Sequence, residues 1–114
     1  MNYPDDENGD VLRRMQADGD DLSRARDINF SVVFPNEVAA ENFARHFKNT
    51  GYKVTVEFSQ VEANHPWDAT VLKHMVPSHS AITEFENELQ EIAKGLDGYN
   101  DGWGCFSQPG KYLQ

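Results

Sequence analysis

Hydrophobic and polar residues alternate along this chain with two different periods, and these periods predict its secondary structure. Alternation with period two over 28–34 and 52–58 predicts two half-buried strands. Apolar residues that recur every three or four positions over 82–96 predict an amphipathic helix. Further patterns predict a helix over about 36–49, a strand over about 67–76, and a short last strand holding Trp103, Cys105 and Phe106.

A short helix is predicted ahead of the first strand, over about 6–17. Acidic residues in its first turn favour the helix dipole, and Gly19 is placed to end it. A helix of this length is not stable alone in water, so it must dock or fray.

The order of these elements predicts an α+β fold. Two helices between four strands, with a hairpin in the middle, is the ferredoxin-like split β-α-β (βαββαβ) plan. The expected sheet is antiparallel and four-stranded, with two helices on one face, and it is preceded by the short N-terminal helix. The other face is open unless the N-terminal helix or a partner covers it. We expect one domain over 1–114, with a core over about 27–106 and a frayed tail over 107–114.

The charge of the chain bears on its partners. The 114 residues include 10 Lys plus Arg and 19 Asp plus Glu, which gives a net charge of −9. Affinity for phosphate backbones requires a basic patch, so direct binding of nucleic acid or of an anionic membrane is disfavoured and a basic protein partner is favoured. The acids concentrate over 1–27 and 84–97, and we expect a basic partner to dock on these helical regions.

Three features indicate the compartment. The single cysteine, Cys105, cannot form an internal disulfide. No apolar run reaches the roughly 18 residues that span a bilayer. The N-terminus is acidic, whereas a signal peptide is basic and then apolar. The expected localisation is cytoplasmic.

No group of chemistry-bearing residues is typical of an active site. The four histidines are too dispersed for a zinc site, and the Asp-Gly loops at 18–21 and 97–102 lack the spacing of a calcium loop. Glu84, Glu88 and Glu91 fall on the solvated side of a helix, where general acid–base catalysis is disfavoured. We therefore expect no enzyme, no cofactor and no metal.

The remaining pattern is aromatic, in the segment Tyr99-Asn100-Asp101-Gly102-Trp103-Gly104. Two large aromatic residues flank a predicted Asn-Asp-Gly turn. One interpretation is a turn that its aromatic rings anchor on the sheet. The other is a partly exposed hot spot for a protein partner, because Trp and Tyr dominate such sites.

This segment resembles the Tyr-Asp-Gly-Trp-Gly signature of the RraB family, the regulators of ribonuclease E activity. Asp18-Gly19-Asp20-Asp21 is similar to the Asp-Gly-x-Asp element of that family, and Gly51-Tyr52-Lys53-Val54 to its Gly-Tyr-x-Val strand start. A further similarity runs from Trp67 to Pro77 and continues at Ile82, Glu88, Leu89 and Ala93, so that the resemblance covers about 10–106.

The resemblance implies a cytoplasmic ferredoxin-like domain without catalysis, which binds ribonuclease E and inhibits cleavage of some transcripts. Two departures bear on the partner more than on the fold. Asn100 stands where the family signature has Asp, and the chain ends eight residues after Phe106, without the long acidic C-terminal extension of some members.

The leading hypothesis is a non-catalytic protein that binds a basic segment of a ribonuclease E-like enzyme and inhibits or modulates it. The predicted partner-binding residues are Tyr99, Asp101, Gly102, Trp103, Gly104, Asp18, Asp20 and Asp21. For the acids, solubility and turn chemistry are the alternative explanation. The alternative function is a stand-alone domain that binds a small molecule or peptide on the open sheet face, lined by Ser31, Thr55, Ser59 and Thr70. The oligomeric state stays open.

Overall fold

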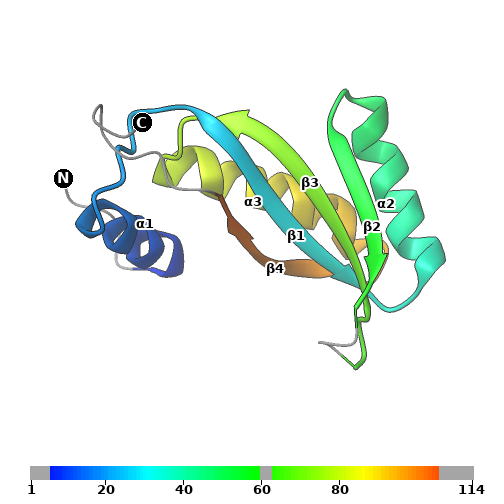
Figure 1. The fold of residues 1–114 in the computed structure, drawn as a ribbon. Coiled ribbons are helices and arrows are strands. Elements are labelled where there is room, and N and C mark those ends of the chain that lie inside the picture. The colour runs from blue at the N-terminus through cyan, green and yellow to red at the C-terminus, as the bar shows by residue number, and fades with distance from the viewer. Residues whose placement is uncertain (1–5, 60–62, 106–114) are drawn as a thin grey trace.

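The computed structural model describes residues 6–59 and 63–105. Within these residues, three helices and four strands follow one another in the predicted order (Figure 1). Their bounds are α1 Glu7–Ala17, β1 Arg26–Phe34, α2 Glu37–Asn49, β2 Lys53–Phe58, β3 Trp67–Met75, α3 His79–Lys94 and β4 Tyr99–Gly104.

The four strands form one antiparallel sheet in the order β2-β3-β1-β4. In the central strand β1, Phe30 lies opposite Val71 of β3 and Trp103 of β4. α2 and α3 cover one face of the sheet, and Figure 1 shows the opposite face toward the viewer. This arrangement confirms the predicted α+β fold of ferredoxin-like type with an additional N-terminal helix.

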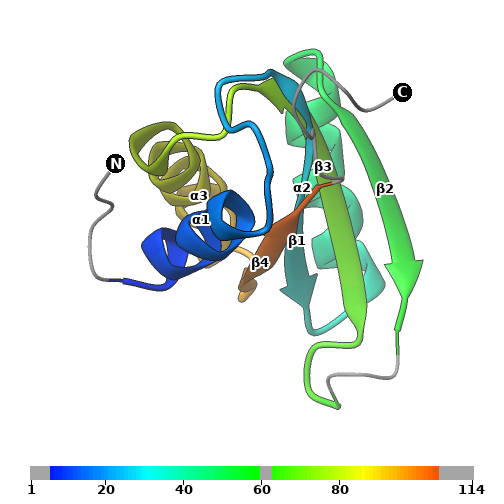
Figure 2. The same cartoon turned by 60° about the vertical axis from the view of Figure 1, so that its left-hand side comes forward.

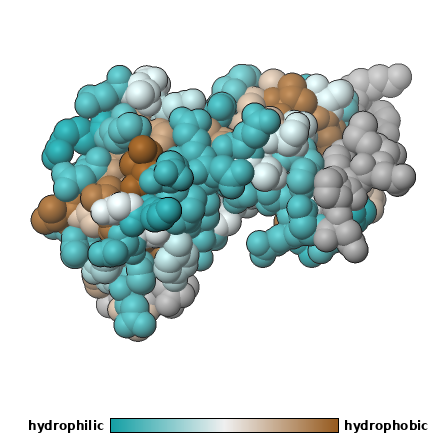
Figure 3. All heavy atoms as spheres, turned by 180° about the vertical axis from the view of Figure 1, so that it is seen from behind, coloured by the Kyte–Doolittle hydropathy of each residue, from teal (hydrophilic) through white to brown (hydrophobic). Residues whose placement is uncertain are grey.

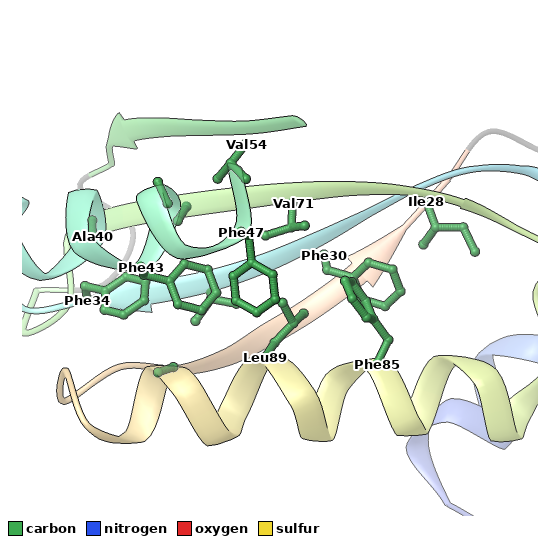
Figure 4. Close-up of a cluster of buried hydrophobic side chains, with 14 of the residues drawn as sticks. Ile28, Phe30, Phe34, Ala40, Phe43, Phe47, Val54, Val71, Phe85 and Leu89 are labelled. Carbon is green, nitrogen blue, oxygen red and sulfur yellow. The ribbon is translucent and has the colours of Figure 1, made fainter. Parts of the chain in front are cut away.

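The hydrophobic core lies between the sheet and these two helices (Figure 4). Alternate residues of β1 are buried and point toward Phe43 and Phe47 of α2 and toward Phe85 of α3. The rings of Phe30 and Phe85 meet edge to face at 4.8 Å, a geometry that aromatic pairs prefer. The period-two and helical patterns of the sequence therefore converge on one core.

α1 docks beside α3, near the β4 edge of the sheet (Figures 1 and 2). The carboxylate of Asp6 accepts a hydrogen bond from the Gly9 backbone at 2.8 Å and so caps the start of the helix. Leu12 is fully buried and belongs to the core. The N-terminal helix therefore lies at the side of the helical layer and not across the open face.

The open face carries polar side chains. Asp68 on β3 accepts hydrogen bonds from the hydroxyl of Ser31 at 2.6 Å and from that of Thr70 at 3.0 Å. Thr55 on β2 is exposed. Among the described residues, no helix lies over this face (Figure 1).

The last strand differs from its prediction. β4 includes the Asn100-Asp101-Gly102 segment that the sequence predicts as a turn, and it ends at Gly104. Its pairing with β1 shifts by one residue, so that Asp101 and Gly102 together lie opposite Ser31. Gly102 has a φ of 109°, which glycine adopts without steric cost and which β-bulges use as turns do. The Asp-Gly pair therefore forms a bulge inside a strand, and the turn prediction is wrong.

Two further predicted segments lie outside the described residues. They are Phe106, which is expected in the last strand, and the tail over 107–114. Cys105 directly follows β4, is half-buried and packs against the core.

Candidate functional site

A pocket of about 160 Å³ lies where α1, α3 and β4 meet. We call it the Trp103–Glu86 pocket. It is lined by Glu7, Asn8, Val11, Glu86, Asn100, Gly102 and Trp103. The pocket therefore draws its walls from segments that lie more than seventy residues apart in the sequence.

The bulge in β4 brings two of these side chains to the same side of the sheet. Asn100 lies opposite Val32 and Trp103 opposite Phe30, and both β1 partners face the helices. In a regular strand, residues three apart point to opposite faces. The extra residue at the bulge therefore lets Asn100 and Trp103 line one cavity.

Asn8 of α1 joins the three elements. Its side-chain oxygen accepts a hydrogen bond from the indole Nε1 of Trp103 at 2.9 Å. Its Nδ2 donates to the Thr83 hydroxyl at 3.1 Å and to the Glu86 carboxylate at 2.8 Å. Since an indole N–H can only donate, the amide orientation of Asn8 is determined by Trp103.

Asn100 holds β4 against α3. Its Nδ2 donates to the Glu86 backbone carbonyl at 2.9 Å, and its backbone N–H donates to the Gln90 side chain at 3.1 Å. A carboxylate at this position would have no hydrogen to donate to that carbonyl when ionised. Asn100, which departs from the family signature, therefore makes a hydrogen bond that an ionised aspartate could not make.

Glu86 is the half-buried acid of the pocket. Burial raises the pKa of its carboxyl above the ordinary value, and the negative charges of Glu7 and Asp6 act in the same direction. The hydrogen bond from Asn8 opposes this shift of the pKa without cancelling it. A negative charge on Glu86 is therefore only partly compensated by the groups around it.

A further acid that acts on Glu86 is Asp6, which caps the start of α1. The Asp6 carboxylate lies 2.9 Å from Nε2 of His79, the first residue of α3. The backbone hydrogen bond from Gly9, with a second from His79, holds the pKa of the Asp6 carboxyl below its usual value. Asp6 thus caps α1 and also ties it to α3.

A second, larger pocket of about 440 Å³ lies beside the loop after α1. It is lined by Gln16, Asp20, Asp21, Leu22, Ser23, Val76, Pro77 and Ser78. Asp20 is buried here and both of its carboxylate oxygens accept from Arg26 Nη1, at 2.9 and 2.8 Å. Arg26 Nη2 also donates to the Asp21 backbone carbonyl at 2.8 Å, so the pair fastens the loop to β1.

Comparison of the sequence with models of known protein families gives a match over most of the chain. The family model named RraB, described as Regulator of ribonuclease activity B, matches residues 5–105. The chain belongs to the RraB family. The match runs from α1 to the residue after β4 and so includes every element that lines the Trp103–Glu86 pocket. A comparison with curated proteins finds no match. Family membership supports a regulatory role for this RraB domain.

The eight predicted partner-binding residues of the RraB domain fall into separate surroundings. Gly102 and Trp103 line the Trp103–Glu86 pocket, whereas Asp20 and Asp21 line the larger one. The four others line neither of these two pockets: Asp18, Tyr99, Asp101 and Gly104 are exposed, and the Tyr99 ring contacts the His65 ring at 4.8 Å. The predicted residues of the 18–21 segment and those of the 99–104 segment therefore line no common pocket of these two.

Sequence reasoning missed Asn8 and Glu86. For Glu86 a signal exists, because helical spacing from Ile82 to Leu89 and Ala93 places it at the margin of the buried stripe. The predicted row of Glu84, Glu88 and Glu91 is exposed, as expected. Nothing in the local pattern around Asn8 indicates its partners, which lie on α3 and β4.

The pocket of the RraB domain is suited to one cationic side chain. A half-buried carboxylate, neighbouring acids and an indole are the groups that recognise a guanidinium or an ammonium. Among the described residues, no group of three or more His, Cys, Asp and Glu side chains is placed to hold a metal ion. In the same part of the chain, no helix is long and apolar enough to cross a membrane. Ser31 and Thr70, which the alternative hypothesis places along a ligand site on the open face, both bond to Asp68 there.

Proposed function

We propose that this RraB-family domain is a non-catalytic cytoplasmic regulator that binds an endoribonuclease of the ribonuclease E type and inhibits or modulates it. The observation that carries the proposal is the Trp103–Glu86 pocket. We place a basic side chain of the ribonuclease in this pocket, with Glu86 as its charge partner and Trp103 as its apolar wall.

Charge favours such a partner over RNA itself. The chain carries a net charge of −9, which repels a phosphate backbone and attracts the Arg- and Lys-rich segments of an RNA-processing enzyme. The two acidic segments of the sequence lie side by side, since α1 packs on α3 (Figures 1 and 2). One acid from each helix, Glu7 of α1 and Glu86 of α3, lines the pocket.

Burial of Glu86 makes the interaction selective. The carboxylate has already lost part of its hydration in the free domain, so a bound cation regains charge compensation at a smaller desolvation cost. The residues predicted from sequence have two parts in this proposal. Trp103 and Gly102 shape the pocket. The exposed Tyr99, Asp101, Gly104 and Asp18, with the half-buried Asp21, contribute to its surroundings and to the long-range field. Asp20, which is buried, acts through the loop it holds.

The test is a binding measurement between the full chain and a purified ribonuclease E-type enzyme. We expect Glu86→Gln to weaken binding about tenfold, equivalent to about 1.4 kcal/mol, because glutamine keeps the hydrogen bond with Asn8 but lacks the charge. Raising the salt concentration from about 0.05 to about 0.3 M should also weaken binding of the wild type. Inhibition of RNA cleavage should fall in parallel with affinity.

Glu84→Gln is the matched control. It removes the same charge from the same helix at an exposed position. We expect its affinity to stay within about twofold of the wild type, since a rim charge contributes little. Equal losses in the two variants would reduce the effect to net charge, and unchanged binding by Glu86→Gln would exclude the pocket as the site.

A further inference from the structure

β2 is an edge strand, and within residues 6–59 and 63–105 no strand pairs with its outer side. It pairs with β3 on one side and stands at the end of the sheet order. Figure 2 shows it at the right-hand margin of the sheet, with no other described strand on its outer side. The outer edge of such a strand presents unpaired N–H and C=O groups, on which another strand can add.

The side chains of β2 match a reversed copy of the same strand. If two copies pair antiparallel about a two-fold axis through Thr55, Lys53 of each copy lies opposite Glu57 of the other. Both side chains are exposed, and within the described part of the chain neither makes an ion pair. The open face of the joint therefore carries two opposite-charge pairs on either side of a Thr–Thr contact.

The helix-facing side of β2 matches itself in the same register. Val54, which is buried, lies opposite the half-buried Val56 of the second copy, and the reverse contact repeats it. Tyr52 lies opposite Phe58, whose side chain is 56% exposed in the single chain. Pairing therefore covers an exposed aromatic residue and extends the apolar layer of the sheet.

No neighbouring register gives this match. A shift of the axis to Val54 places Lys53 opposite Thr55, and a shift to Val56 places it opposite Ser59. A register offset by one residue sets open-face side chains against helix-facing ones. Charges on an edge strand ordinarily discourage pairing, but here the two charges attract each other in one register.

We infer that this chain forms a homodimer through antiparallel β2–β2 pairing centred on Thr55. The two sheets become one continuous sheet, with the β4 strands at its two outer edges. Each Trp103–Glu86 pocket then lies at the far end of the sheet from the joint, so dimerisation leaves both pockets accessible.

Charge reversal on the full chain tests this inference by sedimentation velocity over a concentration series. Lys53→Glu sets Glu against Glu at both ends of the joint, and Glu57→Lys sets Lys against Lys. We expect each variant alone to dimerise at least about tenfold more weakly than the wild type. A mixture of the two variants restores both opposite-charge pairs, and we expect heterodimers with wild-type affinity.

Two further variants control for net charge. Lys94→Glu and Glu88→Lys make the same charge changes at exposed positions of α3, away from β2, and should leave dimerisation unchanged. Circular dichroism and thermal unfolding confirm that each variant is folded. A wild type that remains monomeric, singly reversed variants that still dimerise, or a mixture that does not form heterodimers would each overturn the proposal. If the wild type dimerises and both charge-reversal variants dimerise equally well, the interface lies elsewhere.

Discussion

At the scale of single residues, Asp20 and Arg26 are the two charged residues that are buried within the described part of the chain. Their side chains are only 1% and 2% exposed, and Arg26 Nη1 donates to both carboxylate oxygens of Asp20. A buried ion pair gains little over a hydrophobic replacement of the same shape, but removing one partner leaves an uncompensated charge in the interior. The pair therefore makes the loop after α1 sensitive to substitution.

We predict that Asp20→Ala lowers the free energy of unfolding by about 3–5 kcal/mol, because it leaves the Arg26 guanidinium buried without its carboxylate. Urea unfolding followed by circular dichroism measures the change. Asp18→Ala, two residues away and exposed, is the control and should alter stability by no more than about 0.5 kcal/mol. A loss below about 1 kcal/mol for Asp20→Ala would show that water replaces the pair.

At the scale of elements, the junction of α1, α3 and β4 depends on a few polar contacts. Asn8 is bonded to Trp103, Thr83 and Glu86, while Leu12 is the side chain of α1 that is fully buried. Helices of this length obtain most of their stability from packing and not from propensity. Loosening the junction should therefore release α1 before it affects the sheet.

We predict that Trp103→Phe destabilises the domain by about 1 kcal/mol, since it removes the hydrogen bond to Asn8 and keeps most of the ring. Hydrogen exchange should accelerate in α1 and remain unchanged in β1 and β3. Trp67→Phe is the matched control, because Trp67 packs against Phe58 at the other side of the sheet. Equal acceleration in both variants, or none in α1, would argue against Trp103 as the element that holds α1.

The elements themselves were predictable from local patterns, whereas their junction was not. Period-two alternation and helical spacing report which side of an element is buried, and this was sufficient for the strands, the helices and the sheet type. The position of α1 depends on Asn8, whose partners lie more than seventy residues away. Likewise, Asp101-Gly102 is compatible with a turn or a bulge, and only the pairing with β1 decides between them.

At the scale of the whole molecule, charge and hydrophobicity are distributed differently. Seen from behind, the hydrophobic areas of the surface are separate patches with hydrophilic side chains between them (Figure 3). The acids of α1 and α3 are brought together by the packing of these helices. The sequence predicts that both helical regions are acidic, but their adjacency, and the pocket that results from it, required the structure.

The pKa of Glu86 predicts how stability and binding depend on pH. Because burial raises this pKa above its ordinary value of 4.5, the protonated form is favoured in the folded state. The contribution of Glu86 to stability is therefore greatest below pH 4.5 and declines as the pH rises through the raised pKa. Binding of a cationic partner should strengthen over the same interval, because it requires the carboxylate.

The measurement is urea unfolding of the wild type and Glu86→Gln between about pH 4 and about pH 7. We expect the variant to gain stability relative to the wild type as the pH rises, while its affinity for the ribonuclease stays lower at neutral pH. Opposite effects on stability and on binding distinguish a binding residue from a structural one. A stability difference that does not change with pH would contradict the raised pKa.

The bulge at Asp101 and Gly102 has a consequence for the numbering of β4. Ahead of the bulge the even-numbered residue Asn100 faces the helices, and beyond it the odd-numbered residue Trp103 does so. The strand thus changes parity within six residues. Deleting Asp101 would remove the bulge and leave the indole two positions after Asn100, still on the same side of the sheet. Closing the bulge at the present chain length would instead turn the indole to the opposite side, away from Asn8. At the present chain length, the irregular pairing itself therefore keeps the indole on the side of the helices.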